Sequence, residues 1–404
     1  MKILVICQYY YPEPFRVSDL CEELVRRGHT VHVVTGEPNY PEGKIYPGYE
    51  RHQHAEEELR GVRVHRCPLI PRKTGAFFRL LNYYSYPLSA KRYLRGLPRE
   101  EAESYDLVFV NQLSPVMMAQ PAVYFHRRYG TPLALYCLDL WPVSLTAGGV
   151  GENSPLYRFF RLVSRKLYRA ADRIMVTSRL FRSYLHEEFD IPLERISYLP
   201  QYAEVLFDNL EQKTENEGTK LLFAGNIGAA QSVETILRAA AILRSEPIEF
   251  QIAGGGTELE KLKGLAEQLG LKNVVFFGRR PLEEMPGLYA QADAMLVTLR
   301  SDKALSLTLP GKVQSYMAAG KPVIGAIDGE TQEVIRAARC GFCARAEDAQ
   351  ALADCIRRFV DSNEKVEMGR RAREYYEAHF EKALFMDCLE EEMKETIRSS
   401  SVIL

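Results

Sequence analysis

Short apolar runs alternate with amphipathic stretches along almost the whole chain. Where apolar residues recur every three or four positions, the spacing predicts helices, and the compact apolar runs between them predict buried strands. The predicted strands are Ile3–Cys7, Val31–Thr35, Val62–Arg66, Leu107–Val110, Leu133–Cys137, Ile174–Thr177, Lys220–Ala224, Glu249–Ala253, Val274–Phe277, Ala294–Thr298 and Pro322–Gly325. The predicted helices include Arg16–Arg27, Pro115–Tyr129, Ser232–Arg244, Glu258–Leu269 and Leu282–Gln291. Strands separated by helices favour parallel sheets with helices on both faces.

A polar segment without periodicity, Asn209–Lys220, divides this pattern into two halves, each with its own opening strand. The 404 residues also exceed the size of one ordinary core. We therefore predict an α/β protein with two doubly wound domains, 1–208 and 209–379. Ligands of such sheets bind at the carboxyl ends of the strands, so two sheets facing each other would form a central cleft with two walls.

The amino-acid composition limits which partners and which cellular compartment we expect for the protein. The chain is 46% hydrophobic and 26% charged, as soluble globular proteins are. Its net charge of −1 gives no bias toward nucleic acid. No apolar run approaches the ~20 residues that span a bilayer, and the opening MKILVICQYY has too short an apolar core for a signal peptide. We expect a cytoplasmic protein with reduced thiols.

Glycine loops follow two predicted strands of the second half. In LLFAGNIGAAQSVETIL, Gly225 and Gly228 lie between a strand and a helix, where backbone N–H groups can bind a phosphate. The strand–Gly–helix pattern recurs at Gly254–Gly256. A third strand ends in a turn at Arg279, which is a candidate for a base pocket. Each loop alone is also consistent with a plain strand-to-helix connection.

Lys312 opens the helix in LPGKVQSYMAAGKPVIG, where the helix dipole disfavours a cation unless an anion binds there. Sheet topology places the start of this helix on the same side as Gly225 and Gly228. We therefore predict that Lys312 and the glycine loop share a diphosphate. The alternative is that Lys312 is a solvated loop lysine.

Several segments occur in the order seen in one enzyme family: YYYPEPFRVSDLCEELVRRGHTVHVVT, PNYPEGKIYPGY, YCLDLWPVS, FAGNIGAAQSVETIL, LPGKVQSYMAAGKPVI and DGETQEVIRAARCGF. Together they resemble the WbuB-like branch of family 4 GT-B glycosyltransferases over nearly the whole chain. The resemblance implies two Rossmann-like domains, with a C-terminal helix at about 380–404 crossing back to the first. It also implies a nucleotide-sugar donor, by family habit a UDP-sugar, bound mainly by the second domain. Transfer would retain the anomeric configuration, without cofactor or metal.

The sequence departs from the broad family in the donor motifs. Many members carry Arg and Lys in the phosphate loop, where this chain has Asn226 and Gln231. Many also carry two glutamates whose matching positions here are Leu307 and Ser315. Lys312 is then the main cation candidate, with stabilisation of the leaving diphosphate as its catalytic role. Gln314 or Ser315 would meet the nucleotide, and Glu330 and Glu333 the sugar or ribose hydroxyls.

Asp139 is the catalytic candidate of the first half, because it follows the apolar run Leu133–Leu138 and belongs at a strand carboxyl end. It would orient the acceptor hydroxyl or hold the donor sugar. Trp141 is a candidate platform for a sugar or acceptor. Turn, cap and packing roles explain both residues equally well. Further candidates for the acceptor side are Glu13, Arg16, Asn39 and Tyr40.

No Asp or Glu occurs from Leu59 to Arg99, a segment with ten Lys and Arg residues and interleaved aromatic side chains. Basic and aromatic residues together favour an anionic membrane surface, contacted through 72–99, and a second basic stretch at Arg158–Arg173 would join the same face. We expect a protein peripheral on the inner face of the cell membrane, with a polyprenyl-diphosphate-linked glycan as acceptor. A solvated pair of helices is the alternative.

The predicted function is transfer of a sugar, such as an N-acetylated amino or deoxyamino sugar, in surface polysaccharide biosynthesis. A sugar-nucleotide 2-epimerase shares the two-domain fold, but the donor motifs contain none of the eight His residues. A non-catalytic glycosyltransferase-like subunit is the third possibility, because the glutamate pair is missing.

Overall fold

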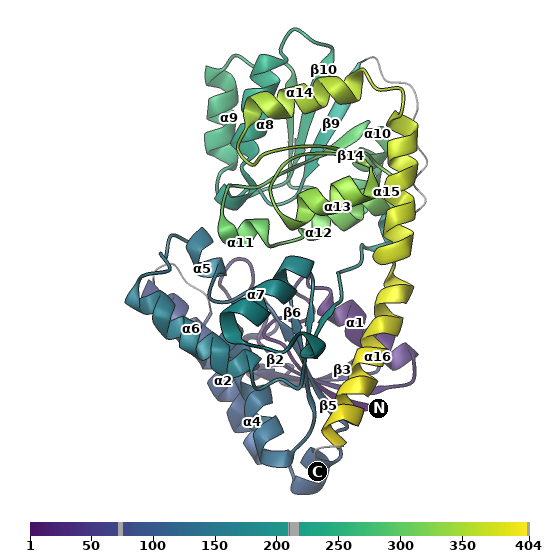
Figure 1. The fold of residues 1–404 in the computed structure, drawn as a ribbon. Helices are drawn as coiled ribbons and strands as arrows, with labels where there is room; N and C mark the ends of the chain where they lie inside the picture. The colour runs from purple at the N-terminus through teal and green to yellow at the C-terminus, as the bar shows by residue number, and fades with distance from the viewer. Residues whose placement is uncertain (72–75, 209, 211–217, 402–404) are drawn as a thin grey trace. The chain divides into compact units, whose positions relative to one another are not determined.

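The structure, a computed structural model, describes residues 1–71, 76–208, 210 and 218–401 (Figure 1). The chain forms two compact units. The first unit comprises Met1–Leu199 and Met386–Leu404, and the second comprises Pro200–Phe385. The division after Leu199 comes earlier than the predicted boundary at residue 208, and most of the predicted linker lies outside the described residues.

The first unit contains an eight-stranded sheet in the order β3-β4-β2-β1-β5-β6-β7-β8. Every pair of neighbours is parallel except β3 and β4. Its strands are β1 (Lys2–Ile6), β2 (Thr30–Gly36), β3 (Glu56–Leu59), β4 (Val62–Cys67), β5 (Leu107–Gln112), β6 (Leu133–Cys137), β7 (Arg173–Val176) and β8 (Ile196–Tyr198). Its helices are α1 (Val17–Arg26), η1 (Glu50–His52), α2 (Ala76–Gly96), α3 (Arg99–Glu103), η2 (Val116–Ala119), α4 (Gln120–Tyr129), α5 (Ser144–Ala147), α6 (Pro155–Tyr168), α7 (Arg179–Phe189) and η3 (Leu193–Arg195).

The second unit contains a six-stranded, wholly parallel sheet in the order β11-β10-β9-β12-β13-β14. Its strands are β9 (Thr219–Ala224), β10 (Ile248–Ala253), β11 (Val274–Gly278), β12 (Ala294–Thr298), β13 (Val323–Ala326) and β14 (Gly341–Ala344). Its helices are η4 (Val205–Phe207), η5 (Ala229–Gln231), α8 (Val233–Ile242), α9 (Leu259–Gln268), η6 (Leu282–Glu284), α10 (Met285–Gln291), α11 (Lys303–Ser306), α12 (Gly311–Ala318), α13 (Glu330–Ala338), α14 (Ala349–Val360) and α15 (Lys365–His379).

The eleven predicted strands coincide with strands of the structure, and two parallel-sheet α/β units confirm the predicted fold class. Helices cover both faces of each sheet, so the central strands are almost wholly apolar and buried. Three strands were not predicted: β3 is rich in glutamate, and β8 and β14 are short. The predicted helix Pro115–Tyr129 is divided into η2 and α4.

The final helix, α16 (Lys382–Ser401), begins in the second unit and continues in the first from Met386 onward. Within the first unit it is tied to the ends of α1 and β7. Arg27 pairs with Asp387 at 2.6 Å, His29 contacts Glu390 at 3.1 Å, and Arg173 pairs with Glu392. Its buried apolar residues in this unit are Met386, Leu389 and Met393. Of the apolar residues before and within this helix, Phe380 and Phe385 belong to the second unit, and Leu384 is exposed.

Glycine is required where the first two glycine loops of the second unit meet. The Gly225 N–H donates to the Ala253 carbonyl at 3.0 Å, and the Ile227 N–H donates to the Gly255 carbonyl at 2.8 Å. A Cβ on Gly254 would lie 1.8 Å from the Gly225 carbonyl oxygen, and the φ of +153° disfavours other residues. Gly254 therefore allows close contact between the two backbones.

We expect Gly254→Ala to lower the free energy of unfolding by about 2 to 3 kcal/mol, because the backbone must move to admit the methyl group. Gly264→Ala is the matched control, since this glycine lies in α9 with open space around its Cβ position. There the better helix propensity of alanine should stabilise by about 0.5–1 kcal/mol. Urea denaturation measures both changes, and equal effects would contradict the proposed packing constraint.

Candidate active site

The glycine loop after β9 is fixed by its neighbours but keeps several amides available. Besides the bonds from Gly225 and Ile227, the Thr298 hydroxyl at the end of β12 donates to the Gln231 carbonyl at 2.6 Å. In the described part of the chain, the N–H groups of Asn226, Gly228 and Ala229 have no protein acceptor. The Ser232 side chain does not cap α8. The loop can therefore donate several hydrogen bonds to an anion.

Tyr316 positions α12 against this loop. Its buried hydroxyl donates to the Ala224 carbonyl at 3.0 Å and accepts from the Ala224 N–H at 3.1 Å. Residues four apart lie on the same side of a helix. Lys312 therefore also points toward the end of β9.

The Lys312 amine lies directly over the glycine loop. Its Nζ donates to the Gln231 side-chain oxygen at 2.6 Å and lies 4.0 Å from the centre of the Phe223 ring. A Cβ on Gly225 would be 2.9 Å from Nζ, so the absence of a side chain there makes room for the amine. The structure thus places Lys312, Gln231 and Gly225 together, as their motifs indicated.

The charge of Lys312 is poorly compensated. Burial lowers the pKa of its amine from 10.5 to about 7, because the charged form loses hydration. No carboxylate among the described residues lies within ion-pair distance of it. An anion bound at this position would favour the charged form and raise the pKa of the amine.

The other residues predicted to bind the donor differ in their exposure and in their contacts. Arg279 is exposed beside Gly255, and Glu330 is buried in the first turn of α13. The Gln314 amide faces the carbonyl groups of Pro310 and Gly311 in its own turn, so those contacts occupy it. Glu333 is exposed and pairs with Arg336 at 3.1 Å on the surface of α13.

Glu204 is a further candidate for the site, and the sequence did not indicate it. The Ser315 hydroxyl donates to a Glu204 carboxylate oxygen at 3.3 Å, so a carboxylate does lie beside the position where the family glutamate is absent. Glu204 precedes η4 in a segment without any recognisable motif. Only the contact with α12 identifies it.

A small cavity of about 200 Å³ adjoins the glycine loop at the start of α8. Lys261 and Arg300 line it, but so do Glu234, Glu258 and Glu347. Lys261 is already paired with Glu258 at 3.0 Å. The excess of carboxylates makes this cavity a poorer anion site than the Lys312 side of the loop.

In the first unit, Asp139 follows β6, as predicted, and accepts a hydrogen bond from the Ser114 hydroxyl. Burial raises the pKa of its carboxyl group to about 6, and the bond from Ser114 opposes this shift. The Gln112 side chain holds the Asp139 carbonyl at 2.9 Å. Ser114 was not predicted, because its proximity depends on the neighbouring strand β5.

For Trp141 the expected role as a platform is wrong, and the packing alternative holds. The side chain is only 1% exposed and packs edge-on against the rings of Tyr83 and Phe160. Its Nε1 donates to the Ser114 hydroxyl at 2.6 Å. The ring is therefore part of the core and fixes Ser114, and it is not available as a platform for a sugar.

Glu13 organises the loops that follow β1 and β2. Its buried carboxylate accepts hydrogen bonds from the backbone N–H groups of Asn39 at 2.8 Å, Tyr40 at 2.7 Å and Tyr10 at 3.3 Å. Burial raises the pKa of Glu13 to about 7, although these bonds favour the ionised form. Glu13, Asn39 and Tyr40 are thus brought together, as expected of one wall of a site. Arg16 lies at the start of α1.

The Tyr40 side chain is partly exposed beside the rings of Tyr9 and Phe15, at centroid distances of 5.7 and 5.2 Å. The buried Asn39 side-chain oxygen has no hydrogen-bond partner among the described residues. This group of aromatic rings with an unsatisfied amide oxygen is suited to contact a hydroxyl-bearing ligand.

The basic segment is less uniformly charged than its sequence indicates. Carboxylates from outside the segment pair with four of its arginines: Arg60 with Glu22, Arg63 with Glu101, Arg66 with Glu57 and Arg99 with Glu103. The side chains of Arg72, Lys73, Phe77 and Arg79 lie outside the described residues. The other cations of the segment, Lys91, Arg92 and Arg95, lie in the last turns of α2.

Neither a membrane-spanning helix nor a metal-binding cluster occurs among the described residues. No helix there has both the length and the apolar character needed to cross a bilayer. No group of three or more His, Cys, Asp and Glu side chains there could bind a metal ion.

Comparison with known proteins adds to this geometry. The family "Glycosyl transferase 4-like domain" matches residues 15–201, and the family "Glycosyl transferases group 1" matches residues 207–376. WcaI of Escherichia coli, named for colanic acid biosynthesis, is 25% identical over 88% of this chain and 91% of its own length. The glycosyltransferase WbjE of Pseudomonas aeruginosa is 26% identical over 62% of this chain and 65% of its own length.

Solved structures show the same fold. Sucrose-phosphate synthase of Thermosynechococcus elongatus superposes with a TM-score of 0.78 at 17% identity, over 98% of this chain and 99% of that chain. Anabaena HepE, solved with UDP and glucose, superposes with a TM-score of 0.69 at 16% identity, over 98% and 99% of the two chains. The fold is therefore GT-B, and the chain belongs to the family 4 glycosyltransferases, with a glycosyl transferase 4-like domain followed by a group 1 domain.

Proposed function

We propose that the protein is a retaining glycosyltransferase that transfers a sugar from a UDP-sugar to a lipid-linked glycan during surface polysaccharide biosynthesis. The relative WcaI is named for colanic acid biosynthesis, and HepE was solved with UDP-glucose. These names support a nucleotide-sugar donor and a polysaccharide product. The transferred sugar belongs to the hexosyl or N-acetylhexosaminyl type in this proposal, as in the WbuB-like branch.

The observation that carries the proposal is the Lys312 amine over the Gly225 loop. A diphosphate there would receive the amine and the N–H groups of Asn226, Gly228 and Ala229. These donors stabilise negative charge that develops on the leaving diphosphate when the glycosidic bond breaks. They act without a metal ion, because the cation is supplied by the protein.

Retention requires attack from the face that the leaving group occupies. The departing diphosphate oxygen then takes the proton of the attacking hydroxyl, so no protein nucleophile is needed. Asp139 would orient the acceptor hydroxyl, and the bond from Ser114 fixes its carboxyl group in one direction. Glu13, Asn39 and Tyr40 would form the wall that contacts the acceptor.

The ribose of the nucleoside would bind beside α12. Ser315 and Glu204 together present a hydroxyl and a carboxylate in place of the missing glutamate. A carboxylate accepts hydrogen bonds from neighbouring ribose hydroxyls. Ser315 and Glu204 are far apart in the sequence, but folding of the second unit brings them into contact.

The acceptor would be a polyprenyl-diphosphate-linked glycan reached from the cytoplasmic side of the membrane. The last turns of α2 supply cations for an anionic surface. The protein would bind the membrane peripherally.

We expect Lys312→Met to weaken UDP binding by about tenfold to a hundredfold at pH 7, because a charge-assisted hydrogen bond is lost. In the wild type, affinity should fall by up to about tenfold per pH unit above pH 7. The sign follows from the lowered pKa of about 7: above it the free amine is neutral, and binding must take up a proton. Isothermal titration calorimetry in buffers of different ionisation enthalpy measures the affinity and the proton uptake together.

Lys263→Met is the control for this experiment. Lys263 is a lysine of the same unit that pairs with Glu260 at 2.8 Å on α9, and its loss should leave UDP affinity unchanged. The proposal for Lys312 is wrong if both variants bind UDP like the wild type, or if UDP affinity of the wild type is flat from pH 7 to 9.

Glu204→Gln should reduce the preference for UDP over 2′-deoxy-UDP. The wild type gains a bond from the 2′-hydroxyl to the carboxylate, and the amide makes a weaker one, so we expect a loss of about fivefold to tenfold in the ratio of affinities. Glu260→Gln removes an exposed carboxylate of the same unit, on α9, and should leave the ratio unchanged. Equal ratios for all three proteins would exclude Glu204 from the ribose site.

The reaction itself is tested by incubating the protein with UDP-sugars and a polyprenyl-diphosphate-linked acceptor, followed by mass spectrometry of the lipid product. The expected result is a gain of one sugar with release of UDP, and NMR of the new linkage reports the anomeric configuration. A carbon-2 epimer of the donor without transfer would identify an epimerase instead. UDP binding without any turnover would identify a non-catalytic subunit.

A further inference from the structure

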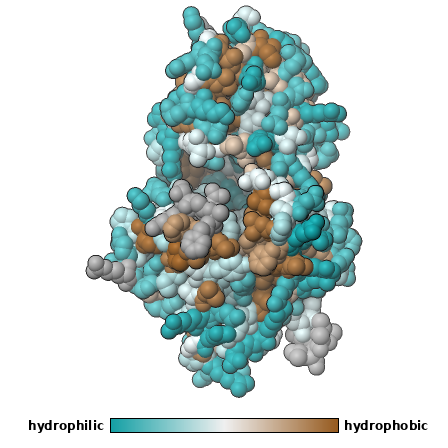
Figure 2. Space-filling view, turned by 90° about the vertical axis from the view of Figure 1, so that its left-hand side faces the viewer, coloured by the Kyte–Doolittle hydropathy of each residue, from teal (hydrophilic) through white to brown (hydrophobic). Residues whose placement is uncertain are grey.

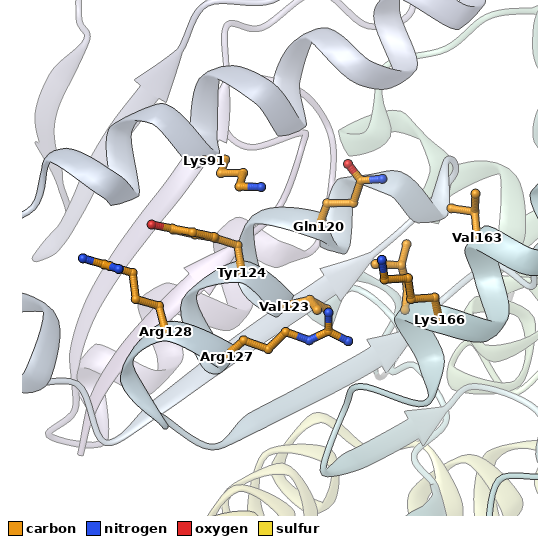
Figure 3. A pocket seen from close by; sticks show the side chains of 9 residues that line it. Lys91, Gln120, Val123, Tyr124, Arg127, Arg128, Val163 and Lys166 are labelled. Atoms are coloured by element: carbon orange, nitrogen blue, oxygen red, sulfur yellow. The ribbon is translucent and has the colours of Figure 1, made fainter.

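A cavity of about 700 Å³ lies among three helices of the first unit. Lys91 of α2, five residues of α4 and three residues of α6 line it (Figure 3). Its size is within the range of small-molecule sites. None of its lining residues belongs to the groups around Glu13 or Asp139.

The charged part of this cavity is entirely positive. Lys91, Arg127, Arg128 and Lys166 line it, and no acidic side chain among the described residues does. Figure 3 shows these side chains arriving from all three helices, with Lys91 beside the Tyr124 ring at 4.9 Å. Over the described ranges of the chain, none of the four has a carboxylate partner.

Two other cations of α6 do have carboxylate partners. On α6, Arg161 pairs with Glu188, and Arg165 pairs with Asp190 at 2.9 Å. Arg161 and Arg165, outside the cavity, are thus compensated, whereas the four cations that line it are not. Four like charges in one cavity repel each other unless an anion binds among them.

The cavity also adjoins exposed apolar surface. Its uncharged lining includes Val123, Val163 and Leu167. On α2 and α6, the turns that precede the basic residues carry exposed apolar side chains: Phe78, Leu80, Leu88, Leu156, Phe159 and Leu162. Figure 2 shows hydrophobic residues gathered on this side of the unit.

Helical spacing places exposed apolar residues and cavity-lining cations on the same side of α2 and of α6. Leu88 is three residues before Lys91, and Leu162 is four residues before Lys166. Leu88 and Leu162 are each 65% exposed, which is unfavourable in water. The Trp141 ring lies between Tyr83 of α2 and Phe160 of α6 and joins the apolar halves of the two helices.

We propose that this cavity binds the phosphate group of an anionic lipid, while the exposed apolar residues of α2 and α6 contact its hydrocarbon. The proposal deepens the lipid-linked part of the proposed function and rests on it. A lipid fits because it combines a phosphate with an apolar chain, as the cavity combines cations with an apolar border. A nucleic acid or a free phosphate would leave the apolar border exposed.

Vesicle co-sedimentation at physiological salt tests the site with the full chain. The wild type should bind phosphatidylcholine vesicles that contain phosphatidylglycerol or a polyprenyl diphosphate, and not phosphatidylcholine alone. The double variant Lys91→Gln/Lys166→Gln should lower partitioning by about tenfold or more. The matched control Arg161→Gln/Arg165→Gln makes the same change in net charge on paired residues, and it should lower partitioning by less than about threefold.

The apolar border has its own variant. Leu88→Gln/Leu162→Gln keeps every charge, and it should also lower partitioning by about tenfold, because hydrocarbon contacts are lost. Thermal unfolding of each variant checks that the fold is intact. Comparison of the two anionic vesicles identifies whether a bilayer lipid or a diphosphate lipid supplies the phosphate.

The proposal is overturned if the two charge variants lose binding equally, which would indicate a diffuse charge effect. It is also overturned if the apolar variant binds like the wild type, or if soluble pyrophosphate binds in the cavity while no vesicle does. UDP titration of the same proteins separates the two proposals. Vesicle binding without UDP binding would retain the lipid site and reject the proposed donor, and UDP binding without vesicle binding would do the reverse.

Discussion

The hydroxyl group of Tyr316 fastens helix α12 to the end of β9, and the candidate donor site depends on this contact. It bonds to both backbone groups of Ala224 in the middle of the second sheet. Because Lys312 is one turn earlier on the same side of α12, its amine reaches the loop at Gly225, where no side chain obstructs it. An unpaired buried backbone group costs about 1–3 kcal/mol, so the same hydroxyl contributes to stability and positions the cation.

Three ionisable groups near strand ends, one buried and two partly buried, differ in how well the protein satisfies their hydrogen-bonding groups. Glu13 has three backbone N–H donors, and Asp139 has the Ser114 hydroxyl. Among the described residues, the Lys312 amine contacts only the neutral side-chain oxygen of Gln231 and the face of the Phe223 ring. Perturbed pKa values concentrate at functional sites, although structural networks also produce them. Of the three, Lys312 has the most to gain from a ligand of opposite charge.

The sequence predicted the fold well, because strands buried on both faces must be continuously apolar. It also predicted that Lys312 would lie near Gly225, since parallel topology brings the carboxyl ends of neighbouring strands to one edge. Glu204 and Ser114 could not be predicted, because each approaches its partner only through tertiary packing. For Trp141 the sequence left a platform role and a packing role open, because a single aromatic residue beside a proline gives no periodic signal of burial. The pairing of Arg60, Arg63, Arg66 and Arg99 likewise depends on carboxylates outside the segment that looked uniformly basic.

The path of the chain has a consequence for how the protein folds during its translation. Since the first unit includes Met386–Leu404, the second unit is an insertion within it. During translation, the second unit emerges completely before the first receives its last helix. Until then, the surface that Met386, Leu389 and Met393 cover on the first unit lacks its final element. The nascent first unit therefore keeps part of its apolar surface uncovered until α16 has been synthesised and can dock.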